Sequence, residues 1–360
     1  MEFVEILLKM IYNLYWPLCF GFLVSTYIRV QVSQENISGL LGKNNLKENF
    51  LAIFFGAVSS SCSYAAASMS KNLFQKGATW QNSLIFLMTS TNMVFEMFVV
   101  IAVLLGRFFF YAELIGALIM VICLRVFMPL FFNNKEVDEQ QEELNKEAMN
   151  HQQMGHGMSD NHEEKMGFGE RLSQGFYMEI SMVIKEILIG VVVGSLIITF
   201  LPDGFFGKLF SALHIGNDFW GILISSIIGA LIAYFAYVCS VGNLVIASAL
   251  WFGGLSVGGV LAFIFSDLIT RPLHLVYIKY YGKKFAGKII GLIGLCAIAS
   301  GVIVDLFIKY ADIKVVTPSS LKSVPFTLDY NFYLTVFFLV IGVFMYFRGR
   351  NLSKGMHMSM

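Results

Sequence analysis

Nine long apolar stretches, separated by more polar connections, govern how this chain can fold. A helix needs roughly 20 apolar residues to cross about 30 Å of hydrocarbon. The stretches lie at about 8–31, 48–74, 79–105, 110–132, 180–201, 218–251, 256–279, 285–309 and 330–348. We therefore expect an all-α polytopic membrane protein with about 8–10 transmembrane helices.

The composition excludes the main alternatives. Hydrophobic residues make up 57% of the chain and charged residues 14%, whereas a soluble protein carries about 25% charged residues. So few charges cannot cover a soluble globule of this length, and they also argue against a disordered chain or a nucleic-acid-binding surface. The N-terminus is acidic and has no cleavable signal pattern, so we expect the first apolar stretch to remain as a span.

The charges that the chain does carry concentrate in one segment. Residues 134–178 hold 10 Asp/Glu and 4 Lys/Arg, a net charge of −6 against +7 for the rest of the chain. We therefore predict a first membrane unit at 1–133, a soluble acidic loop at 134–178 and a second membrane unit at 179–309. Residues 310–360 are then a loop, the last transmembrane helix and a basic tail.

The two membrane units carry a repeat. A shift of 177 residues without gaps superposes Cys62-Ser63 on Cys239-Ser240 and Gly77 on Gly254. Leu73, Leu84 and Phe86 also meet identical residues at 250, 261 and 263. Duplicated halves are the common plan of secondary transporters, which bind their substrate between the halves. Chance matching among apolar helices is the alternative.

Both repeats are predicted to contain an interrupted helix, at Cys62 and at Cys239. The run Ser59-Ser60-Ser61-Cys62-Ser63 lies in the middle of an apolar stretch, and Cys239-Ser240-Val241-Gly242-Asn243 lies at the matching point of another. Small polar residues weaken a long helix, and unwound backbone at membrane depth is tolerated where it lines a cavity. Close helix packing through small residues is the other reading.

These stretches resemble the two signatures of the ArsP-type predicted permease family. The first signature corresponds to residues 60–67, 71–78 and 90–92, and the second to residues 239–243, 249–251, 253–254 and 263–269. Pro272 and residues 280–282 continue the second match, and the resemblance covers about 50–130 and 220–290.

The resemblance implies a polytopic permease of the bacterial plasma (inner) membrane, linked with efflux of heavy metals or metalloids. The best-known relatives export trivalent organoarsenicals and usually carry a Cys-Ser-Cys-Gly run followed by Pro. Here residues 62–65 read Cys-Ser-Tyr-Ala. The chain is therefore more similar to the largely uncharacterised permease branch than to the arsenical branch.

The duplicated thiols are the candidate cargo ligands. Thiolates are soft ligands that suit Cu(I), Zn²⁺ and similar ions, and a pseudo-two-fold axis could bring Cys62 and Cys239 to one cavity. Nearby polar side chains complete the predicted substrate-binding set: Ser63, Asn92, Ser240 and Asn243. Two unrelated buried thiols are the alternative. Cys19, Cys123 and Cys296 lack a repeat partner and are expected to be small buried hydrophobes.

Two carboxylates inside apolar stretches are the candidates for proton coupling. Ionisable groups within a span are costly and usually functional. Glu96 follows Asn92 by four residues, so we expect both side chains on one helix face. Asp267 lies next to the Thr89/Ser266 pair of the repeat. A structural hydrogen bond, or an ion pair between Asp267 and Arg271, is the alternative role.

The acidic loop contains a run of thioether and imidazole side chains. Its tentative, low-affinity metal ligands are His151, Met154, His156, Met158 and His162. Such a flexible segment can capture copper weakly, but the irregular spacing without Cys predicts no defined zinc site. An ordinary linker between the two halves is the alternative.

The sequence therefore predicts a transporter, not an enzyme, that exports a soft metal ion or metalloid. Its expected partners are the lipid bilayer and the ion that it carries, with a homo-oligomer left open and no nucleic acid. No cofactor is expected, and the chain has no Gly-Lys-Ser/Thr nucleotide motif, so ATP could drive it only through another subunit. The alternatives are a transmembrane thiol-disulfide oxidoreductase using Cys62 and Cys239, or a channel-like membrane subunit.

Overall fold

The structure, a computed structural model, describes residues 2–31, 41–59, 63–152, 167–200, 219–236, 240–313 and 330–358, together with 205, 208 and 315. The regular secondary structure of these residues is helical throughout, which confirms the all-α expectation. The helices are α1 (Glu2–Gln31), α3 (Leu46–Ser59), α4 (Ser63–Gln75), α5 (Trp80–Asn92), α6 (Phe95–Leu104), α7 (Arg107–Phe131), α8 (Asn134–Gln152), α9 (Phe168–Phe200), α11 (Phe219–Phe235), α12 (Ser240–Phe252), α13 (Val257–Phe265), the 3₁₀ helix η2 (Ser266–Ile269), α14 (Arg271–Tyr310) and α15 (Tyr330–Met358).

The apolar helices fit a multi-pass membrane protein. Three helical stretches of the described chain are long and apolar enough to cross a membrane, namely Arg107–Phe131, Val257–Tyr310 and Phe332–Leu352. The pair α5 and α6, bent by about 40° at its break, would add a fourth. Shorter apolar helices such as α11 pack beside them.

Separate helices flank both predicted interruptions. α3 ends at Ser59 and α4 begins at Ser63, while α11 ends at Phe235 and α12 begins at Ser240. Cys62 and Cys239 themselves lie outside the described residues. The stretches 48–74 and 218–251 are therefore each divided between two helices.

The expectation of one continuous helix through Asn92 and Glu96 is wrong, because α5 ends at Asn92 and α6 starts at Phe95. The physical cause is a run of hydroxyl side chains that bond back to carbonyl groups of their own helix. Thr89 donates to the Ile85 carbonyl oxygen at 2.8 Å and Thr91 to that of Met88 at 3.1 Å. Such bonds compete with the backbone ladder and bend helices.

The stretch 256–279 is also divided, because α13 gives way to η2 before α14 begins. Pro272 lies in the first turn of α14, where its missing N–H is tolerated, so it favours the start of a new helix. α14 is itself kinked at Gly282, which has a φ of 78°. This kink separates the predicted stretches 256–279 and 285–309.

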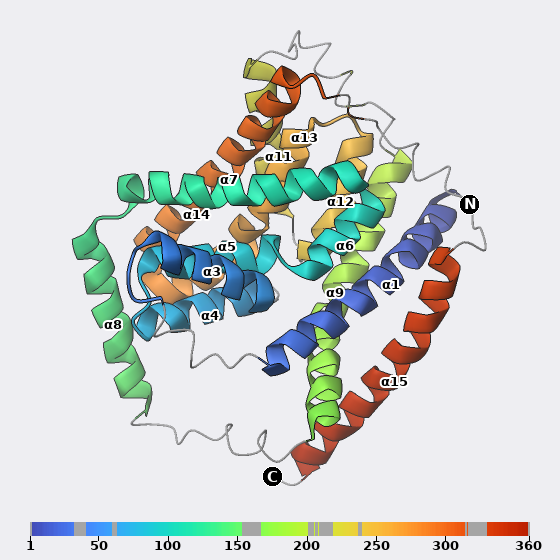
Figure 1. The fold of residues 1–360 in the computed structure, drawn as a ribbon, viewed down its shortest axis with the longest axis horizontal. Helices are drawn as coiled ribbons and strands as arrows, with labels where there is room; N and C mark the ends of the chain where they lie inside the picture. Colours follow the sequence, from blue (N-terminus) through green and yellow to red (C-terminus); the bar gives the residue numbers. More distant parts are fainter. Residues whose placement is uncertain are drawn as a thin grey trace.

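Two short helices form the centre of the bundle. Every residue of α5 and of α13 is buried. α5 packs against α3, α4 and α7, and α13 packs against α11, α12 and α14. Each half of the chain thus surrounds a short central helix with helices from the same half, and Figure 1 shows α7 running across them.

Glycine allows α13 to approach its neighbours at backbone distance. A Cβ atom placed on Gly229 of α11 would lie 2.0 Å from the Gly259 carbonyl oxygen. A Cβ atom placed on Gly258 would lie 2.2 Å from the carbonyl oxygen of Gly301 in α14. Small residues at a membrane helix interface permit this kind of contact.

The turns that follow α4 and α12 have the same hydrogen bonds at an offset of 177 residues. After α4, the Gly77 N–H donates to the Phe74 carbonyl oxygen and the Ala78 N–H to that of Leu73. After α12, residues 254 and 255 donate in the same way to residues 251 and 250. Both are Schellman motifs, with φ values of 102° at Gly77 and 88° at Gly254.

The next helix is also capped alike in the two halves. The Thr79 hydroxyl oxygen accepts a hydrogen bond from the Asn82 N–H at the start of α5. Ser256 accepts one from the Gly259 N–H at the start of α13. A side-chain oxygen here satisfies a backbone donor that the helix leaves open.

The remaining long helices lie at the periphery. α9 packs against α1 and α15, and Figure 1 shows these three together at the side of the N-terminus, away from α8. α9 already begins at Phe168, inside the predicted loop. Cys19, Cys123 and Cys296 are free and buried, as predicted.

Candidate functional site

A buried carboxylate joins the two halves of the chain. Asp267 lies in η2 and is 2% exposed. Its Oδ2 atom accepts hydrogen bonds from the Ser63 hydroxyl at 3.1 Å and from the Ser240 hydroxyl. The Ser63 and Ser240 Oγ atoms are 2.8 Å apart. The site therefore contains three of the predicted residues in mutual contact.

Helix ends place these hydroxyls beside Asp267. Ser63 is the first residue of α4 and Ser240 is the first residue of α12. The N-terminus of a helix carries a partial positive charge and leaves backbone N–H groups unpaired. Two such ends meet at one carboxylate, an arrangement that favours negative charge or an electron-rich ligand nearby.

Several polar atoms around Asp267 are buried and have no hydrogen-bond partner within the described part of the chain. They include Oδ1 of Asp267, the Ser266 hydroxyl, both carboxylate oxygens of Glu113 and the Tyr277 hydroxyl. Asp267 interacts electrostatically with both Glu113 and Tyr277. Unpaired buried polar groups are costly, and in native structures they call for a specific explanation such as a bound ligand or proton.

Two asparagines of the predicted substrate-binding set are also buried. Asn92, at the end of α5, and Asn243, in the first turn of α12, are 1% and 0% exposed. Neither amide has a hydrogen-bond partner among the residues that the structure covers. Their place in the substrate-binding set stays a prediction.

One expectation about the carboxylates needs correction. Glu96 and Asn92 do not share a helix face, because the break at Met93 and Val94 puts them on different helices. Glu96 is buried at the first turn of α6 and is 7% exposed. Its predicted place beside Asn92 on one continuous helix is therefore wrong.

The proposed ion pair between Asp267 and Arg271 is also absent from the described contacts. Arg271 is exposed at the start of α14, and the side-chain hydrogen bonds of Asp267 within the described residues come from serine hydroxyls. Asp267 thus lies in the bundle without a basic partner among the described side chains.

Glu113 is the residue of this site that the sequence reasoning missed. It is fully buried on α7 and shares a helix face with Phe109, Gly116 and Ala117. The sequence did contain a signal, because the small residues Gly116 and Ala117 follow Glu113 by three and four positions. This spacing places them on the same helix face, and small residues are typical of a face that packs against other helices.

The other candidate ligands fall outside what the structure describes. Cys62 and Cys239 are such residues, as are the loop positions Met154, His156, Met158 and His162. His151 belongs to α8, but its side chain is not described. In the remainder of the chain, no group of three or more His, Cys, Asp or Glu side chains is arranged to hold a metal ion.

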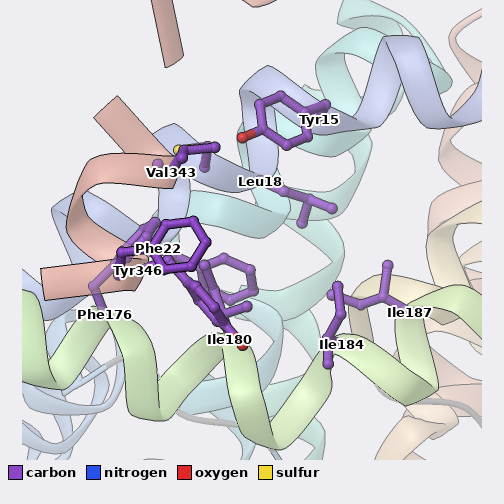
Figure 2. Close-up of a pocket in the computed structure, with 12 residues that line it drawn as sticks. Tyr15, Leu18, Phe22, Phe176, Ile180, Ile184, Ile187, Val343 and Tyr346 are labelled. Atoms are coloured by element: carbon purple, nitrogen blue, oxygen red, sulfur yellow. The ribbon is translucent and has the colours of Figure 1, made fainter. Parts of the chain in front are cut away.

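An apolar cavity of about 220 Å³ lies elsewhere, between α1, α9 and α15. Figure 2 shows Leu18 and Phe22 of α1, Ile180 and Ile184 of α9, and Val343 of α15 around it. None of the residues around Asp267 lines this cavity. It is therefore separate from the polar site.

Comparison with known proteins places the chain in a family. The model of the predicted permease family ArsP_1 matches residues 1–306. The chain belongs to this family. A putative permease of Mycobacterium tuberculosis, Rv2963, is 31% identical over 324 residues, which cover 86% of this chain and 78% of the relative. No solved structure matches the chain.

This permease carries its polar site within the region that defines the family. Ser63, Glu113, Ser240 and Asp267 all fall within residues 1–306, whereas α15 begins beyond them. The protein is thus a multi-pass membrane permease, and its two halves meet at a buried carboxylate.

Proposed function

We propose that this permease is a secondary-active exporter that carries a soft metal ion (copper or zinc) or a metalloid across the bacterial plasma membrane and couples its export to protons. The observation that carries the proposal is the contact of Ser63 and Ser240 with Asp267. It unites the two places in the chain where a helix break adjoins a cysteine, at Cys62 and at Cys239.

The chemistry of the neighbouring residues supports a soft cargo. Cys62 and Cys239 directly precede the two contacting serines in the chain, and thiolates bind soft cations and trivalent metalloids. The buried amides of Asn92 and Asn243 would add polar contacts. Loop residues 151–162 would collect ions weakly before transport.

The matched turns support a duplicated architecture. The Schellman motifs at Gly77 and Gly254 and the caps at Thr79 and Ser256 recur at the offset of 177 residues that relates the sequence identities. Membrane units 1–133 and 179–309 would then be two repeats with the cargo site between them, as in other secondary transporters.

Asp267 would carry the coupling proton, with Glu96 as a second carboxylate at the start of α6. Carboxyl groups are rare within membrane spans, and those that occur there are usually functional. Binding a proton removes its charge and changes its hydrogen bonds, so loading with protons can alter the contact between the halves.

Transport into everted membrane vesicles tests this proposal. Copper, zinc, arsenite and a trivalent organoarsenical are supplied with and without a proton gradient. We expect uptake of at least one ion that depends on the gradient and is lost in Cys62→Ser and Cys239→Ser, with Cys296→Ser as a buried control. Full activity of both variants would refute the thiol site. A reversible disulfide between Cys62 and Cys239 in a protein that transports no ion would favour the oxidoreductase. Ion flux that does not depend on the proton gradient would favour a channel.

A further inference from the structure

The apolar cavity between α1, α9 and α15 opens at the outer surface of the bundle. Three of its lining residues, Ile184, Val343 and Phe347, are 41%, 45% and 53% exposed. On its inner side, Leu18 and Phe22 of α1 are buried. The outer face of a membrane-spanning bundle borders the hydrocarbon of the bilayer. The cavity is therefore accessible to lipid chains from the side.

The walls of the cavity favour an apolar occupant. Aliphatic and aromatic side chains make up most of the lining, and the thiol of Cys19 already donates to the Phe338 carbonyl oxygen at 3.3 Å. An apolar cavity of roughly 150 Å³ stays dry and accepts a molecule the size of benzene. A volume of about 220 Å³ thus leaves room for part of a hydrocarbon chain.

The lining residues of α9 follow one face of that helix. They are spaced by four, four and three positions, as a single helix face requires: Phe176, Ile180, Ile184 and Ile187. Figure 2 shows Phe176 at one end of the cavity and Ile187 at the other. Seven positions before Phe176, the same face carries Gly169 in the first turn of α9. The cavity therefore leads along α9 towards the start of this helix.

Two arginines of α15 lie where this face reaches the end of the bundle. A Cβ atom placed on Gly169 would be 3.9 Å from both terminal nitrogens of Arg348, so the guanidinium group lies over the first turn of α9. Arg350 follows Tyr346 by four positions and Val343 by seven, which puts it on the face of α15 that lines the cavity. Figure 1 shows this end of α15 beside the start of α9.

The positive charge at this end is not balanced within the described part of the chain. Arg348 and Arg350 are exposed, and neither forms an ion pair there. In the first turn of α9, Arg171 adds a positive charge and Glu170 a negative one. The Glu170 carboxylate accepts a hydrogen bond from the Gly167 N–H at 3.1 Å. Arginines at the end of a span favour the cytoplasmic side, where the membrane surface carries anionic lipids.

We propose that the cavity binds one anionic phospholipid, with an acyl chain between α1, α9 and α15 and the phosphate group beside Arg348 and Arg350. A guanidinium group presents a planar fork of N–H donors that matches a phosphate, and basic pockets between membrane helices bind anionic headgroups. The lipid contacts all three helices and stabilises their packing. α15, which supplies both arginines, begins beyond the residues 1–306 that the family model matches.

Native mass spectrometry of the full-length protein in detergent micelles tests the headgroup contacts. Anionic phosphatidylglycerol is compared with zwitterionic phosphatidylethanolamine of the same acyl chains. We expect the wild type to bind phosphatidylglycerol at least fivefold more tightly. Arg348→Gln and Arg350→Gln should each weaken this binding about fivefold, the contribution of one arginine near an anionic lipid, and leave phosphatidylethanolamine unchanged. Arg107→Gln, at an exposed arginine of α7, is the matched control and should change neither.

A second pair of variants tests the acyl chain. Val343→Trp puts a large side chain at the cavity wall and should weaken the binding of both lipids at least fivefold. Val340→Trp adds the same side chain at an exposed position of α15 that does not line the cavity, and should bind lipid as the wild type does. Circular dichroism and gel filtration verify the fold. If Val343→Trp does not fold, Ile184→Trp fills the cavity from α9.

Glycerophosphate, which shares the phosphate chemistry of the lipid but has no acyl chains, separates a lipid site from a site for a free phosphate compound. We expect it to leave bound phosphatidylglycerol in place. Displacement at equal concentration would overturn the proposal in favour of a soluble ligand.

Three further results would also overturn it. The wild type could bind the two lipids within a factor of two, or the cavity-filling variant could retain the full affinity for phosphatidylglycerol. A dimer that retains no lipid and dissociates in Val343→Trp would assign the cavity to a second copy of the chain. Because no ion is transported in these measurements, their outcome is independent of the proposed metal export.

Discussion

Ser63 and Ser240 are 177 positions apart in the chain, and their hydroxyl oxygens are 2.8 Å apart in the structure. Each begins a helix, and both hydroxyl oxygens lie within hydrogen-bond distance of the same oxygen of Asp267. The contact therefore joins equivalent positions of the proposed repeats at their interface. The free energy that this contact contributes to folding can be measured.

A double-mutant cycle of Ser63→Ala and Ser240→Ala should give a coupling energy of about 1 kcal/mol, the range of hydrogen bonds between membrane helices. The measurement is the free energy of unfolding in detergent micelles or bicelles. Ser248 is the control partner, because its hydroxyl donates to the Val245 carbonyl oxygen of its own helix. The cycle of Ser63→Ala with Ser248→Ala should be additive within about 0.5 kcal/mol, and equal coupling in both cycles would contradict the direct contact.

Alanine at Gly77 or Gly254 should destabilise the protein by about 1–2 kcal/mol, because both positions have positive φ values that a Cβ atom disfavours. The two costs should be similar, since the two turns share their hydrogen bonds. Thermal unfolding of the purified variants provides the measurement. Gly287→Ala is the control, because this helical glycine has open space around it, and it should be neutral or stabilising.

Gly258→Ala should lower the free energy of unfolding by about 1–3 kcal/mol, because its Cβ atom would collide with the Gly301 carbonyl oxygen. A backbone atom cannot turn aside as a side chain can. Gly294→Ala in α14 provides the comparison, because its Cβ atom would lie 3.5 Å from Ile269, an ordinary contact. If both variants unfold at the same temperature as the wild type, the close approach of α13 and α14 is wrong.

The docking of α8 should depend on pH and salt. Lys288 of α14 donates a hydrogen bond to Glu136 of α8, and this bond, with the charge of Lys288, lowers the Glu136 pKa below its usual value of 4.5. A lowered pKa in the folded state stabilises docking above the usual value, and this contribution is lost as the pH falls through the lowered one.

Amide hydrogen exchange of α8 should therefore increase as the pH falls below about 4.5, after correction for the intrinsic rate, and also at high salt. In Lys288→Gln this extra dependence should be absent. Gln141 and Gln75 also tie α8 to α4 through backbone carbonyls, so docking should weaken but persist. A pH response that is unchanged in Lys288→Gln would exclude the ion pair as its cause.

The positions of the helix breaks beside Ser63 and Ser240 could be predicted, because small polar residues inside apolar stretches have a direct effect on helix stability. For the contact with Asp267, the sequence predicted only that the two halves of the chain would meet near Cys62 and Cys239. Which atoms touch depends on how helices rotate about their axes, and a single sequence does not encode this rotation in any local pattern.

Two features were missed for physical reasons. The break after Asn92 has no Gly or Pro to mark it, and arises from hydroxyls that bond back to their own helix. Glu113 lies near the beginning of an apolar stretch, where a carboxylate is usually solvated at the membrane surface. Its burial follows from the packing of α7 against α13 and α14, which brings residues distant in sequence together.

The glycine contacts around α13 determine which parts of the molecule can move independently. At Gly229 and Gly258 no side chain separates α13 from α11 and α14, so sliding one of these helices would drive backbone into backbone. The three helices are therefore a stiff block. α4 and α12, in contrast, meet at hydroxyl groups that can part by rotation about a single bond. A reporter group attached to α11 should consequently record the same displacement as one on α14, and a different one from a reporter on α4.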